Sequence, residues 1–570
     1  MAAPSVAAGA RRPPEMVMRL ERMGSFHQCR LSFMRTLLRR MKREAWTFAR
    51  TRFDIDARGV GTALYSVTVP TTSGPDRTYT LVAFADDLPP EQRSDRVIAT
   101  AWDATFTLHD GVPSHEDIER LRANVPLQEA GRISAKELTL SRANRSVRLF
   151  SSVVDALAAG RQPDRDFVDD VGYLMRTTAV YGSGKFGAAD RTSVEDRPEL
   201  VAPFQAEMLT VFLIRAFVLD LVEHMAAARA PESAVTIEPS LRRRFGIGNS
   251  TGLGMAPFLI THPRLIHNWI VAREEAFARV RAVDVATTEE IAQFLDVVGG
   301  ARLTVESWHS EHGVQRRKLA DLHADLDLID TYLNTTDLAE PFAWDQLARW
   351  AHDVLSIEGQ ELVVSLMLEP YGHLVDDLTE IMHADESLPA RIVGTMTISA
   401  ARTLLETRYG WALAIDWESP RADARAWYVS EEKLEPRLGE RHDEPIGDYE
   451  QPLQPGRDAS KMYDDLGTWE ETQTLAAFLR SHPEHRHSAR RLMIVADSPY
   501  GEIQDNTIDL EMLPIDLLRS KLSFFGATHF DPRSDRWVRI TMFRGAPFPH
   551  EIATSDPDSW SYPTAHDAVE

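Results

Sequence analysis

Apolar residues recur at three- and four-residue steps through most of this chain, the spacing that is typical of amphipathic helices. Capping boxes at Ser134–Glu137 and Thr287–Glu290 mark two helix starts. A further amphipathic helix, broken near Gly24, is predicted within residues 16–48. In the middle of the chain the pattern predicts helices at 114–124, 134–159, 164–181, 199–229, 262–282, 287–298, 300–333, 343–368, 372–385 and 388–408.

Short apolar segments bounded by turn residues predict strands near both ends of the chain. Residues 63–70 and 78–85 are predicted to form a hairpin. The other expected strands are 96–108, 411–417, 426–429, 491–496 and 537–543. The simplest arrangement pairs N- and C-terminal strands into one antiparallel or mixed sheet against a helical body. This is a mainly α fold with a smaller β part (α+β); two separate α+β caps are the alternative.

Four regions follow from this pattern. Residues 1–15 are expected to be a disordered tail, and 16–110 hold the N-terminal helix and the β hairpin region. Residues 111–410 form the helical body that carries the candidate site. The last region, 411–570, is an α+β part with an extended arm at 430–467, which is rich in Glu, Asp, Pro and Gly.

The composition indicates the cellular compartment of the protein and the classes of partner it can bind. The 570 residues carry a formal net charge of −23, which would repel nucleic-acid phosphates. The single cysteine, Cys29, allows no intramolecular disulfide, as is usual in a reducing compartment. The most apolar run, 208–222, is too short to cross a membrane, and the first 14 residues lack the apolar core of a signal peptide. We expect a cytoplasmic homo-oligomer with no nucleic-acid or membrane partner.

Two glycine-rich segments, 181–187 and 245–257, stand out within the predicted helical body. Glycine backbones approach ligands closely, and successive amides in such turns bind anions. The side chains expected to bind a carboxylate or phosphate substrate are Arg176, Lys185, Arg191, Arg244, Asn249 and Thr251. The acid–base candidates are Tyr181, Ser250, His262 and His267.

An alternative explanation assigns these glycines to helix caps and close helix packing. Neither segment has the spacing of a nucleotide-binding phosphate loop, and neither follows a predicted strand. We expect the two segments to face one another, with Lys185 and Asn249 within about 20 Å, the reach of one small ligand.

Residues 178–184 and 248–257 resemble the two glycine-containing loops of helical fumarase-type lyases. The resemblance covers fewer than twenty residues and implies lyase chemistry on a small anion. The second segment lacks the Lys and Asn that follow the proline in that family, and the terminal β segments do not match it.

Pairs of Glu and His at positions i and i+3 offer a metal site, because both side chains share a helix face. The pairs are Glu306 with His309 and Glu380 with His383. A third pair, Glu484 with His487, falls in a predicted loop. A bundle with two such motifs would hold iron or manganese.

Three functions therefore stay open. The leading one is a lyase or transferase that acts on a small anionic metabolite and needs no cofactor. A di-metal oxygenase or oxidoreductase is the second, and a non-enzymatic assembly or binding protein is the third.

Overall fold

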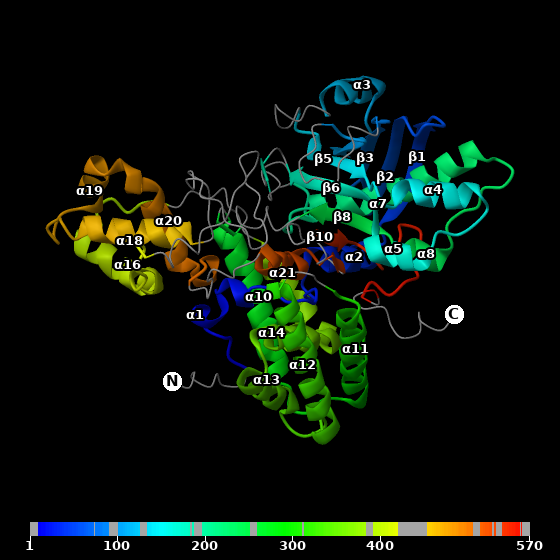
Figure 1. The fold of residues 1–570 in the computed structure, drawn as a ribbon. Helices are drawn as coiled ribbons and strands as arrows, with labels where there is room; N and C mark the ends of the chain where they lie inside the picture. The colour runs from blue at the N-terminus through cyan, green and yellow to red at the C-terminus, as the bar shows by residue number, and fades with distance from the viewer. Residues whose placement is uncertain are drawn as a thin grey trace. The chain divides into compact units, whose positions relative to one another are not determined.

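The computed structural model describes residues 9–72, 74–89, 101–125, 134–182, 185–186, 196–250, 259–260, 262–309, 313–383, 391–419, 453–504, 514–526, 529–531, 539–558 and 560. The chain divides into two compact units made of interleaved segments. Unit 1 comprises Met1–Phe26, Gly252–Leu295 and His312–Lys521, and unit 2 comprises His27–Thr251, Asp296–Glu311 and Leu522–Glu570. Most of the elements are helices and the strands form one sheet (Figure 1), which confirms the predicted α+β class.

The sheet lies in unit 2 and has the order β1-β2-β3-β4-β5-β6-β8-β10-β9, with β7 paired to β6. Its strands are β1 (Thr47–Ile55), β2 (Gly61–Val69), β3 (Arg77–Ala85), β4 (Ala104–Asp110), β5 (Glu137–Arg145), β6 (Tyr173–Gly182), β7 (Lys185–Phe186), β8 (Gly246–Ser250), β9 (His529–Asp531) and β10 (Arg539–Met542). All neighbours are antiparallel except β6 and β8, which run parallel. The sheet is thus mixed and joins N- and C-terminal strands, as predicted.

Strands β5 and β6 replace parts of two predicted helices. The helix predicted at 134–159 is wrong over β5, and the one predicted at 164–181 is wrong over β6. Every residue of β5 except Arg142 is buried. The sequence of β5 alternates polar and apolar residues from Glu137 to Ser141, but the capping-box match at Ser134–Glu137 favours a helix there, and the structure shows that this match does not start one.

In the C-terminal region, two segments predicted to be strands are wholly or partly helical in the structure. The strand predicted at 491–496 lies inside helix α20 (Arg486–Asp497), and the strand predicted from 411 begins inside α16 (Ile398–Leu413). Part of the predicted arm is helix α18 (Gln454–Leu466), whereas 426–429 and the arm up to residue 452 lie outside the described residues. Strand β10 falls within the predicted strand at 537–543.

Helices cover both faces of the sheet in unit 2. They are α2 (Phe33–Arg43), α3 (His115–Asn124), α4 (Phe150–Ala158), α5 (Arg165–Val171), α7 (Gln205–Arg229) and α8 (Pro239–Arg243). On one face, Phe217 of α7 packs edge-on against Phe106 and Tyr65. On the other face, Leu121 of α3 packs with apolar residues of β2, β3 and β5. Both faces are therefore covered at the middle of the sheet, whereas β1 at its edge is mostly exposed. Helix α7, which packs on one face, is buried over most of its length.

Unit 1 is helical in the described residues. Its elements are α1 (Pro14–Val17), η1 (Leu20–Arg22), α10 (Pro263–Arg281), α12 (Gly313–Thr335), α13 (Ala343–Val354), α14 (Ile357–Met367), η4 (Glu369–Tyr371), α15 (Gly372–Val375), η5 (Asp376–Met382), α16, α18, α19 (Leu475–Ser481), η6 (Pro483–His485), α20 and η7 (Pro499–Gly501). The unit boundaries fall inside α11 (Thr288–Glu306) and α21 (Pro514–Phe525). No helix among the described residues is both long and apolar enough to cross a membrane.

A buried ion-pair network ties the N-terminal segment into unit 1. The Arg12 guanidinium donates to Glu274 at 2.8 and 2.9 Å and to Glu361 at 2.8 and 3.2 Å. Arg22 and Arg273 complete the network by pairing with Glu361 and Glu274 respectively. Residue 12 lies in the predicted disordered tail, yet its side chain is buried between α10 and α14.

This network determines how Glu361 titrates. Burial alone would raise the pKa of Glu361, but the neighbouring guanidiniums, Arg12 first, lower it to about 2. The folded-state pKa is therefore lower than that of an exposed Glu in the unfolded chain. Such a carboxylate stabilises the fold above the unfolded pKa, and its contribution is lost as the pH falls towards 2.

We predict that Glu361→Gln lowers stability at pH 7 by about 3–5 kcal/mol, because it leaves buried guanidiniums without their charged partner. The midpoint of urea unfolding at pH 7, 5 and 3 measures this. The variant should lose less stability than the wild type between pH 5 and 3. The exposed Glu471→Gln is the control and should follow the wild type. Equal losses on acidification in the wild type and Glu361→Gln would contradict the assignment.

Candidate functional site

The second glycine-rich segment contains strand β8, and the first contains the last two residues of β6 and the short strand β7, so neither is a loop that closes a helix where it is described. Strand β8 runs parallel to β6 and pairs with residues 173–177, which precede the first segment. Thr177 pairs with Asn249 across the two strands, and the Asn249 amide donates to the Thr177 hydroxyl at 3.1 Å. Lys185 pairs with Gly182 further along β6. Strand β5 occupies the other edge of β6 at Gly182, so Lys185 and Asn249 are on the same edge. The strand from Thr177 to Gly182 spans roughly 16 Å, within the predicted separation.

The predicted anion-binding residues have different surroundings. Arg176 is buried in the sheet, where it pairs with Asn144 on one side and Gly248 on the other. Arg244 contacts both carboxylate oxygens of Asp169 at 2.7 Å. The Lys185 side chain, and Arg191 and Thr251 altogether, lie outside the described residues.

The predicted acid–base residues divide between the two units. Tyr181 and Ser250 are strand residues of unit 2, and their side chains lie outside the described part of the structure. His262 is the N-cap of α10 in unit 1. His267, on the same helix, accepts a hydrogen bond on Nδ1 from the Tyr500 backbone N–H at 3.1 Å. Burial lowers the pKa of His267 to about 4, so this ring is neutral at pH 7 and has a structural partner.

Close strand packing accounts for two of the glycines. A Cβ on Gly248 would lie 2.7 Å from the Tyr173 ring, and one on Gly246 would meet the backbone of Met542 on β10. Neither residue caps a helix and both pack against neighbouring strands, whereas the alternative explanation assigned the glycines to helix caps and close helix packing. A ligand is not required to explain Gly246 or Gly248.

The predicted metal residues are not among the potential metal ligands that lie together in the described part of the chain. Glu306 and His309 are exposed and belong to unit 2. Glu380 and His383 belong to unit 1, where Glu380 lies on the 3₁₀ helix η5 and not on an α-helix. A different group of carboxylates and histidines has the spacing of metal ligands: Asp465, His482, Glu484 and His485.

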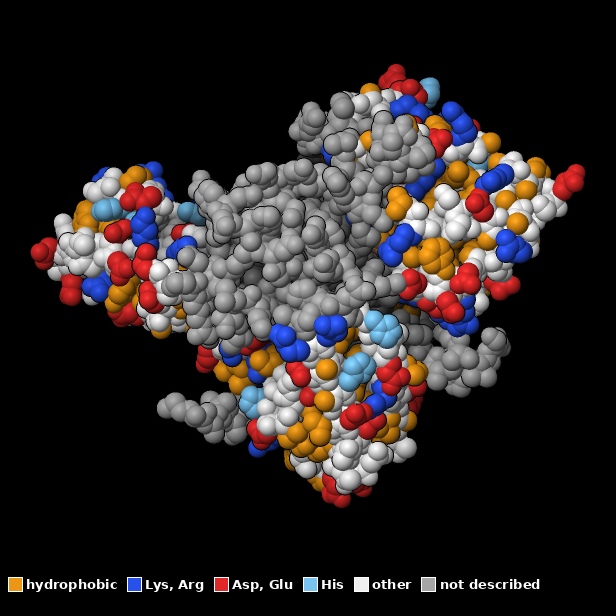
Figure 2. Space-filling view, viewed as in Figure 1, with side chains coloured by type: hydrophobic (Ala, Val, Ile, Leu, Met, Phe, Trp, Pro, Cys, Tyr) orange, Lys and Arg blue, Asp and Glu red, His pale blue; other side chains and the backbone are white. Residues whose placement is uncertain are grey.

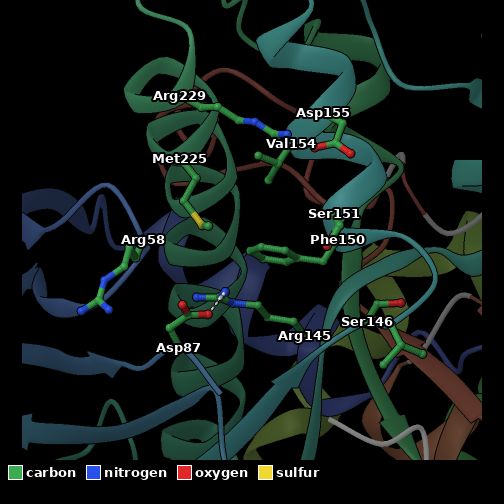
Figure 3. Close-up of a pocket in the computed structure, with 11 residues that line it drawn as sticks. Arg58, Asp87, Arg145, Ser146, Phe150, Ser151, Val154, Asp155, Met225 and Arg229 are labelled. Carbon is green, nitrogen blue, oxygen red and sulfur yellow. Dashed lines mark hydrogen bonds and ion pairs between the residues drawn. The ribbon is translucent and has the colours of Figure 1, made fainter. Parts of the chain in front are cut away.

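Unit 2 also contains a surface pocket of about 510 Å³, which we call the arginine pocket (Figure 3). It lies between the β1–β2 turn, the end of β5, helix α4 and the last turns of α7. Its lining residues are Arg58, Asp87, Arg145, Ser146, Val147, Phe150, Ser151, Val154, Asp155, Met225 and Arg229. Three arginine side chains thus line a pocket whose wall is partly apolar.

Arg145 is the fixed element of the arginine pocket. Its guanidinium lies 4.8 Å from the centre of the Phe150 ring and pairs with the fully buried Asp103 at 3.7 Å. It also donates to the backbone oxygen of Asp86 at 3.1 Å and contacts Asp87 at 3.4 Å. These contacts define one orientation for the Arg145 side chain.

Arg58 and Arg229 are the exposed elements of the same pocket. Their side chains are 73% and 62% exposed, and they pair with the surface carboxylates Asp56 and Asp155. Exposed ion pairs of this kind contribute little, about 0–1 kcal/mol each. Both guanidiniums can therefore exchange their present partner for another anion at small cost.

Comparisons with protein-family models, with curated proteins and with solved structures found no match for this chain. The segments that resemble fumarase-type lyases are strands of a mixed sheet where they are described, whereas the resemblance implied loops of a helical protein.

Sequence reasoning missed both groups that the structure assembles. The arginine pocket brings together residues from 58 to 229 that share no motif, so it needs the fold. The group of Asp465, His482, Glu484 and His485 has a partial sequence signal, because three of its members lie in the run His482-Pro-Glu-His485. The spacing rule for helices selects only the pair Glu484 and His487 there, because no sequence pattern shows that helix α18 brings Asp465 close to this run.

The packing explanation for the glycines is testable. We predict that Gly248→Ala destabilises unit 2 by about 1–3 kcal/mol, because the added methyl group overlaps the Tyr173 ring. The control is Gly299→Ala in α11, where no atom lies within 4 Å. It should be neutral or stabilising by up to about 1 kcal/mol. Thermal unfolding of the full chain measures both, and an unchanged midpoint for Gly248→Ala would contradict the explanation.

Proposed function

We propose that this protein binds a small anionic metabolite with an apolar part, and that the arginine pocket is the binding site. The observation that carries the proposal is the arrangement of its guanidiniums. Arg145 is buried and fixed at the wall, while Arg58 and Arg229 are exposed and available for exchange. A site that binds an anion needs both a preorganised donor and donors whose present partners are easily displaced.

The charge of the pocket supports an anion over a cation. Its lining contains three arginines and two aspartates, on a chain whose net charge is −23. The face shown in Figure 2 has basic and acidic side chains interspersed over its described residues, without a broad basic surface. A local group of guanidiniums of this size suits one carboxylate or phosphate group and not a nucleic-acid backbone.

The apolar wall of the pocket indicates the chemistry of the ligand beyond its anionic group. Phe150, Val154 and Met225 line the pocket, and Figure 3 shows the Phe150 ring directed towards Met225. Val147, a further lining residue, is 49% exposed. A volume of about 510 Å³ lies within the roughly 300–1,000 Å³ of small-molecule sites. These features favour a phosphate ester or carboxylate with a short hydrocarbon or aromatic group.

Catalysis is a separate part of the proposal. The pocket lining holds serine hydroxyls and carboxylates but no His, Cys, Lys or Tyr. Lyase or transferase chemistry therefore stays a prediction that concerns the segments around β6 and β8. The expected homo-oligomer also stays a prediction, which sedimentation of the purified chain would test.

Binding of inorganic phosphate and phenyl phosphate, followed by calorimetry, tests the arginine pocket. We predict that phenyl phosphate binds more tightly, because its ring contacts the apolar wall. Each exposed arginine should contribute about fivefold in affinity, or roughly 1 kcal/mol, so Arg58→Ala with Arg229→Ala should weaken binding about 25-fold. The control is Arg43→Ala on α2, which removes a comparably exposed arginine paired with Glu44.

Two outcomes would overturn the proposal. One is an unchanged affinity for phenyl phosphate in the double variant with a normal unfolding midpoint. The other is the absence of saturable binding by either probe to the wild-type chain.

A further inference from the structure

Helices α16, α18, α19 and α20 of unit 1 share a hydrophobic core of their own. Buried residues of all four helices meet in it, including Leu405, Met462, Phe478 and Leu492. At one end of this core the apolar packing gives way to polar side chains. Figure 2 shows histidine side chains next to acidic ones over α18–α20.

Two segments of this bundle supply four potential ligands. Asp465 lies in the last turn of α18, and its backbone oxygen accepts hydrogen bonds from the Thr468 amide and hydroxyl, at 3.2 and 2.7 Å. His482 is the C-cap of α19, where its N–H donates to the Phe478 carbonyl at 2.8 Å. Glu484 and His485 follow on the 3₁₀ turn η6, and Pro483 fixes the backbone at the start of that turn.

The ligand atoms are close enough to share one ion. One nitrogen or oxygen from each of Asp465, His482, Glu484 and His485 lies within 4.8 Å of each of the others. His485 Nε2 is 2.6 Å from Asp465, and His482 Nδ1 is 3.2 Å from Glu484. Zinc bonds of about 2.0–2.2 Å in a tetrahedron place ligand atoms about 3.3–3.6 Å apart. Displacements well below 2 Å would therefore convert the group into a coordination sphere.

Aromatic packing already orients both imidazoles. The Phe478 ring stacks on His482 with centroids 4.8 Å apart and on His485 with centroids 5.6 Å apart. Trp469 meets the His482 ring edge-on at 6.0 Å. Ligands held in place by their surroundings lose less freedom on binding, so this packing preorganises the group.

We propose that Asp465, His482, Glu484 and His485 form a binding site for a divalent transition-metal ion, and that zinc is the ion that fits it best. Two imidazole nitrogens favour zinc over magnesium or calcium, which prefer sites made of oxygen atoms. Four protein ligands in a tetrahedron are typical of structural zinc sites and not of catalytic ones, which keep a position open. The ion would fasten the end of α18 to the α19–α20 junction. This site does not depend on the arginine pocket, which is in unit 2.

The four residues also have a simpler interpretation as two separate ion pairs, Asp465 with His485 and His482 with Glu484. The two interpretations make different predictions. A pair of ion pairs does not bind metal stoichiometrically, and removal of one pair leaves the other intact. A shared ion couples all four side chains, so the loss of any one ligand weakens binding.

Titration of the untagged full chain, after treatment with a chelator, with Zn²⁺ and Co²⁺ tests the proposal. We expect one zinc per chain and a tetrahedral Co²⁺ absorption spectrum. His482→Ala and Asp465→Asn should each weaken zinc binding at least about 100-fold, since changes to residues that only orient a ligand already cost 10–100-fold. The control is His487→Ala, which removes an exposed histidine of α20 that is not in the group.

His485 is buried, so its removal is less informative than that of the more exposed ligands. Glu484→Gln provides a second test, because its side chain is 52% exposed and its removal leaves the core intact. Circular dichroism confirms that each variant is folded. The proposal is overturned if the wild-type chain binds less than a stoichiometric amount of zinc, or if folded His482→Ala and Glu484→Gln bind it as tightly as His487→Ala.

Discussion

Buried arginine side chains join segments that are far apart in this sequence, and the architecture of each unit depends on them. In unit 2, Arg215 of α7 donates to the backbone oxygens of Phe245, Ala546 and Arg243, and its guanidinium lies 3.8 Å from the centre of the Phe548 ring. In unit 1, Arg12 links α10 to α14 through two carboxylates. A guanidinium has five donors in a plane, so one side chain can satisfy groups from several segments. Because an unpaired buried charge is costly, these contacts fix which segments belong together.

The sequence predicted helices well where local signals agree with the hydrophobic period. Helix α3 has the predicted bounds within a residue, and its N-terminus shows the reciprocal capping of Ser114 and Asp117. Prediction failed where a local signal was misleading or the apolar segment was short. The capping-box match at Ser134–Glu137 is followed by strand β5, and the segment 491–496, a short apolar run, is a helix in the structure. Both errors arise because tertiary packing, and not local preference, decides the state of a short apolar segment.

The candidate sites were less predictable than the fold for a related reason. The pairing of β6 with β8 follows from the crossover through α7, which no local pattern of glycines encodes. Arg244 carries the charge that an anion site needs, yet Asp169 occupies its guanidinium. Residue type alone thus cannot distinguish a structural cation from one that binds a ligand. The difference lies in the exposure and identity of the partner, which only the folded chain reveals.

The two proposed sites share one physical principle, which is the combination of a buried pair with an exchangeable one. In the arginine pocket, Asp103 is fully buried and orients Arg145, whereas Arg229 and its partner Asp155 are both more than half exposed. In the α16–α20 bundle, His485 is buried beside Asp465, whereas half of the Glu484 side chain is exposed. The buried side chain keeps its partner close because desolvation makes complete separation of the two costly. The exposed pair separates at little cost, because water screens it. A ligand therefore meets a site that is oriented in advance and that gives up weak contacts for strong ones.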